Sequence, residues 1–352
     1  IRHTVICEGT EPDEIALEDW LARGDPAFRA VQMQPDDPAV LLYSSGTTGQ
    51  PKGVTLTHRN IATNMRTAAK CSGYRRSDRL ALFLPLFHVF GQNYIMNAGF
   101  EAGATLALFR RYAPEPVLEA IERDRITKFF AVPTIYIGLL NMDLAQRDLS
   151  SIDYYFSAAA TMPEEISRRW TERFGARVYE GYGLTECSPF ACYNHATEHR
   201  FGSVGTAVEG FTLAIHGDDD QELPRGEWGE ICIRGPGVMK GYWGRPEDTD
   251  RALRHGWLHS GDIGRMDEDG YVYIVDRVKD MVNVSGFKVW PAEVEHVLYR
   301  HPAVQECAVY AAPDALKGEQ VRAAVVLKAG RRATGDELAQ FCRDRLAAYK
   351  IP

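Results

Sequence analysis

The stretch Tyr43-Ser-Ser-Gly-Thr-Thr-Gly-Gln-Pro-Lys-Gly-Val54 holds two serines, two threonines, three glycines and one lysine in twelve residues. Apolar runs at 39–43 and 54–58 flank it, so the pattern predicts a strand, a loop and a second strand. Glycines let a backbone approach a ligand closely, while the hydroxyls and the Lys52 ammonium can donate to phosphate oxygens. We therefore expect a phosphate-binding loop. The alternative is a flexible linker, which the flanking strands disfavour.

This loop differs from a Walker P-loop, which needs Gly, four residues, and then Gly-Lys-Ser/Thr. Counted from Gly46, Pro51 takes the place of the second glycine, and Gly53 follows Lys52. The hydroxyl that would hold Mg²⁺ is therefore absent from its usual position, and a Mg²⁺ ligand is expected elsewhere in the chain.

Length and composition limit the class of protein. The 352 residues are 45% apolar and 25% charged, as in a globular protein of two or three domains. The net charge of −8 disfavours a nucleic-acid platform. Seven cysteines without a Cys-x-x-Cys pair favour free thiols in a reducing cytoplasm. The start does not resemble a signal peptide, and the most apolar stretch, 129–140, is too short to span a membrane. We expect a cytoplasmic location.

Residues 38–183 alternate strand-like and helix-like patterns, which predicts an α/β fold with a doubly wound, mostly parallel sheet. Ligands of such sheets bind beyond the carboxyl ends of the strands. We assign residues 1–200 to the α/β part of a large domain. The expected strands lie at 39–43, 54–58, 80–84, 104–109, 128–132, 154–157 and 177–179, and the expected helices at 60–71, 116–125, 134–142 and 163–174.

Residues 201–275 show no helical pattern, and short apolar segments between turns predict a small β-barrel that completes the large domain. Asp218-Asp-Asp220 is interpreted as a solvated hairpin tip and not as a metal site, because adjacent carboxylates converge poorly on one ion. Residues 277–352 predict a small α+β lid domain, with a helix at 291–300 and a capping box at Thr334–Glu337.

Three further segments carry candidate chemistry. Gly181-Tyr-Gly-Leu-Thr-Glu186 follows a predicted strand and pairs a hydroxyl with a carboxylate, as a phosphate and its Mg²⁺ require; a surface turn is the alternative. Ser260-Gly-Asp262 is read as a glycine turn whose Asp is a ribose ligand or a cap. Asp276-Arg277 lies at a domain seam and predicts a ligand contact or an interdomain ion pair.

Two further positions, a histidine and a pair of arginines, indicate a function less specifically. His88 lies in the apolar loop 85–91, where a structural histidine and a functional one are both open interpretations. Arg110-Arg111 follows a predicted strand and either attracts an anionic ligand or ends the strand in solvent.

These motifs, in this order, resemble those of the adenylate-forming superfamily, which includes acyl-CoA synthetases, aryl-CoA ligases, luciferases and peptide-synthetase adenylation domains. The resemblance covers nearly the whole chain. It rests on the segments 43–54, 181–186, 260–262 and 276–291. It implies that a carboxylic acid reacts with ATP, that pyrophosphate leaves, and that the acyl group passes from an acyl-adenylate to CoA.

The resemblance also implies a role for each matched residue, with Lys52, His88, Thr185 and Glu186 as the catalytic set. The β- and γ-phosphates would be held by Ser44, Ser45, Gly46, Thr47, Thr48 and Lys52, the α-phosphate by Thr185 and the Mg²⁺ by Glu186. The adenine would be framed by Ala159, Gly181 and Tyr182, and the ribose would be held by Asp262 and Arg277. The acyl pocket would be bordered by His88 and Phe90, the CoA side by Gly286 and Arg111, and Lys279 would be the hinge between the domains.

Two departures from the family pattern concern the ends of the chain. Members carry a Gly-Lys near the end of the small domain, and that lysine bridges the acyl carboxylate and the phosphate; this sequence ends at Pro352 before it. The family's N-terminal portion is missing ahead of Ile1. We expect the chain to be part of a longer enzyme and, by itself, to be impaired in adenylation.

The substrate expectation rests on one position. Members that activate amino acids place an Asp where this chain has Phe87-His88, so an acid without an α-amine is favoured. We expect a medium- or long-chain fatty acid, with an aryl acid as the alternative.

A non-catalytic nucleotide-binding relative and a luciferase-like monooxygenase are the rival classes. The expected partners are the acid, ATP, CoA and Mg²⁺, without nucleic acid. A membrane-surface contact and a homodimer are left open.

Overall fold

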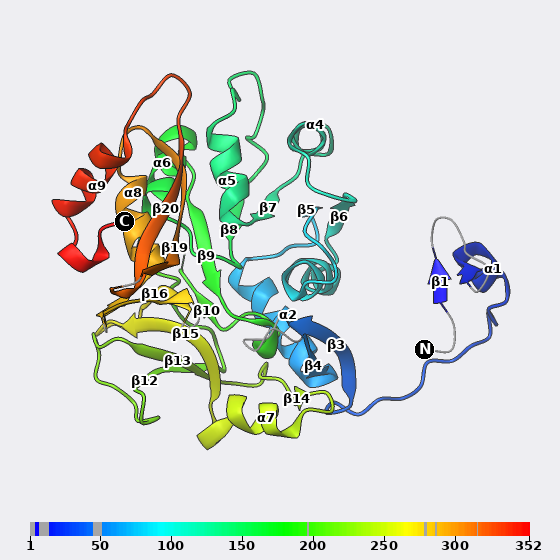
Figure 1. The fold of residues 1–352 in the computed structure, drawn as a ribbon. Helices are drawn as coiled ribbons and strands as arrows, with labels where there is room; N and C mark the ends of the chain where they lie inside the picture. Colours follow the sequence, from blue (N-terminus) through cyan, green and yellow to red (C-terminus); the bar gives the residue numbers. More distant parts are fainter. Residues whose placement is uncertain are drawn as a thin grey trace. The chain divides into compact units, whose positions relative to one another are not determined.

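A computed structural model describes residues 4–6, 14–44, 51–195, 197–277, 280–285, 287–314 and 316–352, with residues 4–6, 14, 276 and 277 described by backbone alone. The chain divides into two compact units, residues 1–34 and residues 35–352 (Figure 1). In the first unit, β1 (Thr4–Ile6) pairs in parallel with β2 (Glu14–Ala16), which leads into the short helix α1 (Leu17–Ala22).

The centre of the second unit is a seven-stranded sheet in the order β11-β10-β9-β8-β7-β5-β6. The five strands from β9 to β6 run parallel, and β10 and β11 add an antiparallel edge. The bounds are β5 Arg79–Leu82, β6 Thr105–Leu108, β7 Lys128–Ala131, β8 Tyr154–Ser157, β9 Val178–Tyr182, β10 Cys192–Tyr193 and β11 Thr206–Ala207. The predicted α/β class with a mostly parallel sheet is confirmed.

Alternate residues of the parallel strands face two different hydrophobic cores. On β7, Phe130 belongs to one core and Phe129 to the other, and on β8 the same holds for Phe156 and Tyr155. Both faces are therefore covered, which explains the continuous apolar runs in the sequence. One core holds side chains of α2 (His58–Cys71) and η1 (Phe90–Asn97), and the other holds those of α4 (Pro114–Asp124), α5 (Pro133–Leu140) and α6 (Glu164–Phe174).

The segment between 85 and 104 is more helical than the sequence indicated. The π-type helix η1 begins at Phe90, inside the predicted loop, and α3 (Ala98–Ala102) follows it directly. The predicted helix over 60–71 begins two residues earlier, because the Thr57 side chain caps it and Asn60 completes a capping box.

The remaining strands of the large part pair antiparallel. A three-stranded sheet has the order β14-β4-β3, and the predicted small barrel takes the form of a four-stranded sheet, β12-β13-β15-β16. The bounds are β3 Pro38–Ser44, β4 Lys52–Thr57, β12 Thr212–His216, β13 Gly229–Arg234, β14 Gly241–Tyr242, β15 Leu258–Met266 and β16 Val272–Arg277. The turn 217–220 joins β12 to the segment that follows, as expected for Asp218-Asp-Asp220.

The prediction that residues 201–275 contain no helix was wrong. Helix α7 (Pro246–Ala252) and the 3₁₀ turn η3 (Arg254–Gly256) lie between β14 and β15. Pro246 occupies the first turn of α7 and Glu247 and Asp248 follow it, which is a favourable helix start. A helix of two turns with no buried residue leaves no apolar periodicity to detect.

In its described residues, the C-terminal part contains a four-stranded sheet in the order β18-β17-β20-β19, two α-helices and a short 3₁₀ helix. The predicted capping box is confirmed: Thr334 accepts from the Glu337 N–H, and the Glu337 carboxylate accepts from the Thr334 N–H. The bounds are β17 Val282–Val284, β18 Phe287–Val289, α8 Pro291–Tyr299, β19 Val304–Asp314, β20 Gly318–Leu327, α9 Gly335–Arg343 and η5 Ala348–Lys350. The predicted domain boundaries at 200 and 277 stay predictions.

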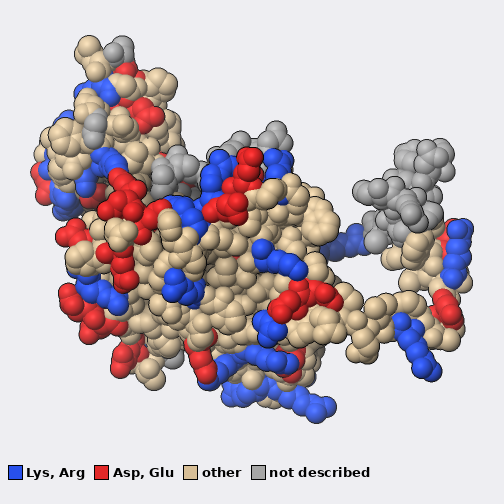
Figure 2. All heavy atoms as spheres, turned by 90° about the horizontal axis from the view of Figure 1, so that it is seen from below, with Lys and Arg blue, Asp and Glu red and all other residues tan. Residues whose placement is uncertain are grey.

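Figure 2 shows Lys and Arg side chains lying among Asp and Glu side chains over most of the face in view. Across the described ranges, every helix is too short or too polar to cross a bilayer. The six described cysteines are free thiols.

Candidate active site

A cavity of about 1290 Å³ lies at the carboxyl ends of the parallel strands, where the loops after β5, β8 and β9 meet. This is the edge at which doubly wound sheets bind ligands. Its lining includes the predicted residues Ser44, Lys52, His88, Phe90, Ala159, Gly181, Tyr182, Thr185, Glu186 and Asp262.

The other predicted site residues are less well defined. Ser45, Gly46, Thr47, Thr48, Lys279 and Gly286 lie outside the described residues. Arg277 is described by its backbone, as the last residue of β16. Arg111 is exposed and does not belong to the cavity lining.

One wall of the cavity holds four interacting side chains, Lys52, Glu186, Tyr242 and Asp248, which we call the charged corner. Lys52 was expected in the loop but is the first residue of β4, and its side chain is nine-tenths buried. Its Nζ lies 3.1 Å from Asp248 Oδ1 and 5.0 Å from the centre of the Tyr242 ring. The Tyr242 hydroxyl donates to Glu186 Oε1 over 2.9 Å.

The side chains of the charged corner are paired with one another, and this pairing shifts the pKa of two of them. The hydrogen bond from Lys52 keeps the pKa of Asp248 below its usual range. Burial, together with the neighbouring Glu186 carboxylate, raises the pKa of Tyr242, so the phenol keeps its proton and donates it. One wall of the cavity thus offers both a lysine and carboxylate groups, as an anionic ligand with a cation requires.

Ser44, the last residue of β3, adds a hydroxyl on the same side, because β3 and β4 pair Ser44 with Lys52. Its Oγ is buried and has no hydrogen-bond partner among the residues that the structure describes. A buried hydroxyl without a partner carries a free-energy cost that a ligand oxygen would remove.

The segment Gly181–Glu186 is built differently from the predicted turn. Gly181 and Tyr182 are the last residues of β9, and Thr185 opens the 3₁₀ turn η2 (Thr185–Cys187). The glycines are needed for close packing: a Cβ on Gly183 would lie 1.5 Å from the Pro189 carbonyl oxygen. The chain therefore passes tightly over Pro189 and presents Thr185 and Glu186 to the cavity.

Asp262 also lies elsewhere than expected, inside strand β15 and not on a turn. Ser-Gly-Asp is a turn-like sequence, but here Gly261 takes a φ of 76° within the strand, and the Asp262 N–H donates to Ser260 Oγ. The Tyr182 hydroxyl donates to Asp262 Oδ2 over 2.7 Å. In the ladder between β15 and β16, Asp262 stands directly opposite Arg277.

The loop after β8 contributes backbone at a strained position. Ala159 has a φ of 70°, which a residue with a Cβ rarely adopts. Ala158, Ala159 and Ala160 all line the cavity, so this loop offers a small-residue wall that a flat ring could approach.

His88 lines the cavity from the loop after β5. Its Nδ1 accepts the Phe90 N–H over 3.1 Å, and burial lowers the pKa of the imidazole. Both effects favour the neutral ring with its proton on Nε2. Phe90 is buried beside it as the first residue of η1.

Sequence reasoning missed Tyr242 and Asp248, which complete the charged corner. The signal for Asp248 was present in Pro246-Glu-Asp-Thr249, a typical helix start that places acids in the first turn. Nothing local marks Tyr242, which reaches Glu186 because β14 pairs with β4 and sets Tyr242 opposite Val54.

Comparison with known proteins gives two family matches. The profile of the AMP-binding enzyme family matches residues 2–243, and that of the AMP-binding enzyme C-terminal domain matches residues 293–352. The long-chain-fatty-acid–CoA ligase of Bacillus subtilis (strain 168) is 43% identical over 321 residues, covering 90% of this chain and 57% of the relative. The chain therefore spans less than two thirds of that protein.

Two solved structures are similar throughout. The anthranilate CoA ligase AuaEII in complex with anthranoyl-AMP has a TM-score of 0.92 and 33% identity, covering 100% of this chain and 69% of that one. ATP-bound MatB from Rhodopseudomonas palustris has a TM-score of 0.89 and 33% identity, covering 97% of this chain and 68% of that one.

Proposed function

The chain belongs to the AMP-binding enzyme family, and we propose that the protein containing it is an ATP-dependent ligase that joins a carboxylic acid to CoA through an acyl-adenylate. The observation that carries the proposal is the single cavity that gathers the charged corner, the Ala159 loop and Asp262. The names of the similar proteins, which include a fatty-acid–CoA ligase and a ligase with a bound acyl-AMP, support the same reaction class.

In the proposed first step, a carboxylate oxygen of the acid attacks the α-phosphorus of ATP, and the bond from that phosphorus to pyrophosphate breaks. Negative charge grows on the departing pyrophosphate, so fixed donors beside it lower the barrier. Lys52 and the Ser44 hydroxyl line the cavity and would supply such donors. Residues 45–48 would add others. Thr185 faces the same cavity and would hold the α-phosphate.

Glu186 suits a Mg²⁺ ion, because Tyr242 occupies its Oε1 with one hydrogen bond and carboxylate oxygen is a preferred ligand of this cation. When bound with ATP, Mg²⁺ would neutralise phosphate charge. The Tyr242 hydrogen bond would fix the orientation of the carboxylate, as outer-shell partners do at metal sites.

The nucleoside would contact other residues of the cavity lining. The backbone of Ala159 and the ring of Tyr182 would frame the adenine, and Asp262, held by the Tyr182 hydroxyl, would accept from the ribose. Arg277 stands opposite Asp262 in the ladder and would contact the ribose from the neighbouring strand.

A fatty acid is the favoured substrate, and an aryl acid is the second candidate. The apolar Phe90 and the neutral His88 border the expected acyl side, and no carboxylate replaces them to pair with an α-ammonium. The fatty-acid ligase among the relatives supports the first candidate, and the anthranilate ligase supports the second. In the second step, the CoA thiol would displace AMP from the adenylate, with Arg111 and Gly286 on the CoA side.

The test is an AMP-release screen of the natural protein that contains this chain, with acids from acetate to palmitate, benzoates and amino acids, each with and without CoA. We expect CoA-dependent turnover with fatty acids. A response restricted to benzoates would select the second candidate, and one restricted to amino acids would overturn the substrate assignment. ATP binding without AMP release for any acid would favour the non-catalytic alternative.

A further inference from the structure

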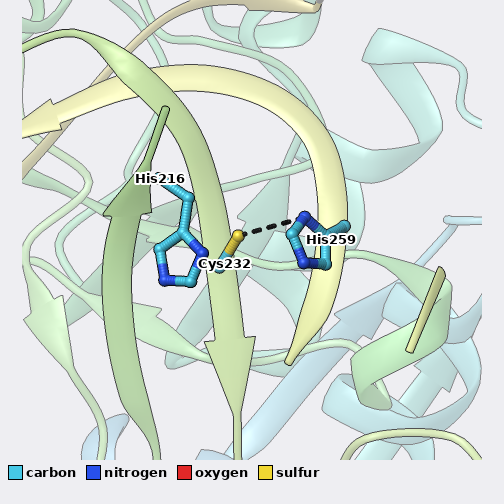
Figure 3. A group of neighbouring side chains, drawn as sticks. All are labelled: His216, Cys232 and His259. Carbon is cyan, nitrogen blue, oxygen red and sulfur yellow. Dashed lines mark hydrogen bonds between the residues drawn. The ribbon is translucent and has the colours of Figure 1, made fainter. Parts of the chain in front are cut away.

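Three metal-ligating side chains meet on one face of the four-stranded sheet: His216 of β12, Cys232 of β13 and His259 of β15, which we call the His–Cys cluster (Figure 3). The strand register brings them together. Cys232 stands directly opposite His259, and on its other side it stands opposite Ala214, two residues before His216. Residues two apart in a strand share a face, so all three side chains lie on the same side.

The side chains of the His–Cys cluster point toward one another. Figure 3 shows the two imidazoles on either side of the Cys232 thiol, and one ligand atom of each residue lies within 4.8 Å of the others. Cys232 Sγ is 3.4 Å from His259 Nδ1, so the thiol lies against the edge of that imidazole. Ligands of a tetrahedral zinc ion lie about 3.3–3.8 Å apart, given the usual Zn–N and Zn–S distances. Nδ1 of His259 is also 2.8 Å from Glu230, so Nε2 would be its ligand atom, and side-chain rotation would have to bring Nε2, the Cys232 thiolate and a His216 nitrogen around one ion.

Two nitrogens of the cluster are buried without a hydrogen-bond partner in the described part of the chain: His216 Nδ1 and His259 Nε2. The residues themselves are only 5% and 8% exposed. Buried polar atoms are almost always paired, so two orphans in one cluster indicate a missing partner. A cation bound between them would satisfy both.

Glu230 sets the orientation of His259. Its Oε2 lies 2.8 Å from His259 Nδ1, and its Oε1 accepts the Gly261 N–H, also over 2.8 Å. When a carboxylate accepts the N–H of an imidazole, the other ring nitrogen keeps a lone pair for a metal. This arrangement is common for metal-bound histidines. For His259, that other nitrogen is the orphaned Nε2.

We propose that His216, Cys232 and His259 bind a divalent d-block cation, with Zn²⁺ as the preferred ion. Two imidazoles and one thiolate form a donor set that suits zinc, and a water molecule would complete a four-coordinate shell. Binding replaces the thiol proton with the metal: the S–H bond breaks, the metal–sulfur bond forms, and one proton goes to solvent. The site differs from the one proposed for Mg²⁺ at Glu186, where the protein offers oxygen ligands.

Such an ion would connect three strands of the sheet that carries Asp262, only three residues beyond His259. Its role would be structural, because Cys232 is fully buried and binding would tie β12, β13 and β15 together. We expect the thermal unfolding midpoint to rise when the metal is added, whether or not ATP is present.

The test uses the natural protein that contains this chain, stripped with a chelator and then titrated with ZnCl₂ or CoCl₂. We expect one tightly held metal per chain by elemental analysis, a thiolate-to-cobalt charge-transfer band, and a higher unfolding midpoint. Cys232→Ser should abolish the band, and His216→Gln should lower the metal content. Cys342→Ser, which removes an equally buried thiol in α9, should leave all three readouts as in the parent protein.

Absence of tight metal in the zinc-loaded parent protein would overturn the proposal, as would a charge-transfer band retained in Cys232→Ser. If Cys232→Ser fails to fold, His216→Gln and the cobalt spectrum of the parent protein decide the matter, because the band itself reports a thiolate ligand. All these readouts are independent of ligase activity, so failure of the proposed function would leave them unaffected.

Discussion

The charged corner and the His–Cys cluster are both buried polar groups, yet they satisfy their polar atoms in different ways. In the charged corner, Lys52 pairs with Asp248, and Tyr242 donates to Glu186. In the His–Cys cluster, a nitrogen of His216 and one of His259 lack any partner in the described residues. A corner whose charges are already paired can hold its shape while a substrate comes and goes. A cluster with orphaned nitrogens is better suited to a permanently bound ion.

Removing the ammonium of the charged corner should have the largest effect. We expect Lys52→Met to slow adenylate formation by about 10²–10³-fold, the usual cost of one fixed donor to a developing anion. The measurement is ATP–pyrophosphate exchange in the natural protein. Lys70→Met, which removes an exposed lysine paired with Glu209, is the control and should leave exchange unchanged. Equal rates for the two variants would place Lys52 outside the chemistry.

The Glu186 carboxylate of the charged corner tests whether a group that already accepts a hydrogen bond can also bind a cation. Glu186→Gln keeps an oxygen for the Tyr242 hydroxyl but removes the charge. Loss of a ligand should weaken Mg²⁺ binding by at least the roughly 10–100-fold typical of outer-shell partners. The readout is the Mg²⁺ concentration that half-saturates pyrophosphate exchange, with exposed Glu119→Gln as the control. An unchanged Mg²⁺ requirement would remove Glu186 from the metal site.

A smaller effect is expected on the nucleoside side. Tyr182→Phe deletes the hydroxyl that donates to Asp262, a hydrogen bond to a charged group that is typically worth about 1.5–3 kcal/mol. We expect the KM for ATP to rise about tenfold with a smaller change in kcat. Tyr136→Phe is the matched control, since Tyr136 is not part of the cavity lining and its buried hydroxyl donates to the Phe156 carbonyl. A KM that rises equally in both variants would indicate a general packing defect.

The smallest expected effect lies at the border of the His–Cys cluster, where Arg254 holds Asp220 with two hydrogen bonds. The hydrogen bond from Arg254 lowers the pKa of Asp220 to about 2 from an ordinary value of 3.8. A lowered folded-state pKa stabilises the fold above the unfolded pKa, and this contribution fades as the pH falls toward the folded pKa.

Unfolding midpoints of the parent protein and Asp220→Asn should therefore differ most near pH 6 and converge as the pH falls below about 4. The measurement is thermal unfolding at a series of pH values in metal-free buffer. Asp218→Asn, which changes an exposed neighbour in the same turn, should follow the parent protein throughout. A difference that grows on acidification would contradict the assigned sign.

Much of the fold was predictable from sequence because its strands are buried on both faces and its helices begin at clear signals. The strand 154–157 and the capping box at Thr334 are examples in which local pattern and structure agree. The helices η1 and α7 were missed, since the first lies in an apolar segment without periodicity and the second buries no residue.

Local motifs predicted one side of the candidate site better than the other. Lys52, Thr185 and Glu186 were identified because each lies in a glycine-rich motif, and the structure places them in one cavity. Tyr242 became visible only through the pairing of β14 with β4. The His–Cys cluster was equally hidden, because its members are spread over 44 residues of chain and only the strand register makes them neighbours.

The pairing of Asp262 with Arg277 has a mechanical consequence. Arg277 ends β16, so the backbone that carries it leads directly to the C-terminal strands and helices. A nucleoside held by both residues would stabilise the last residue pair of the β15–β16 ladder. Without it, this pair would open locally, as strand ends do. Amide hydrogen exchange near residues 262 and 277 should then slow when a nucleotide binds, and the same protection should extend a few residues into the chain that follows.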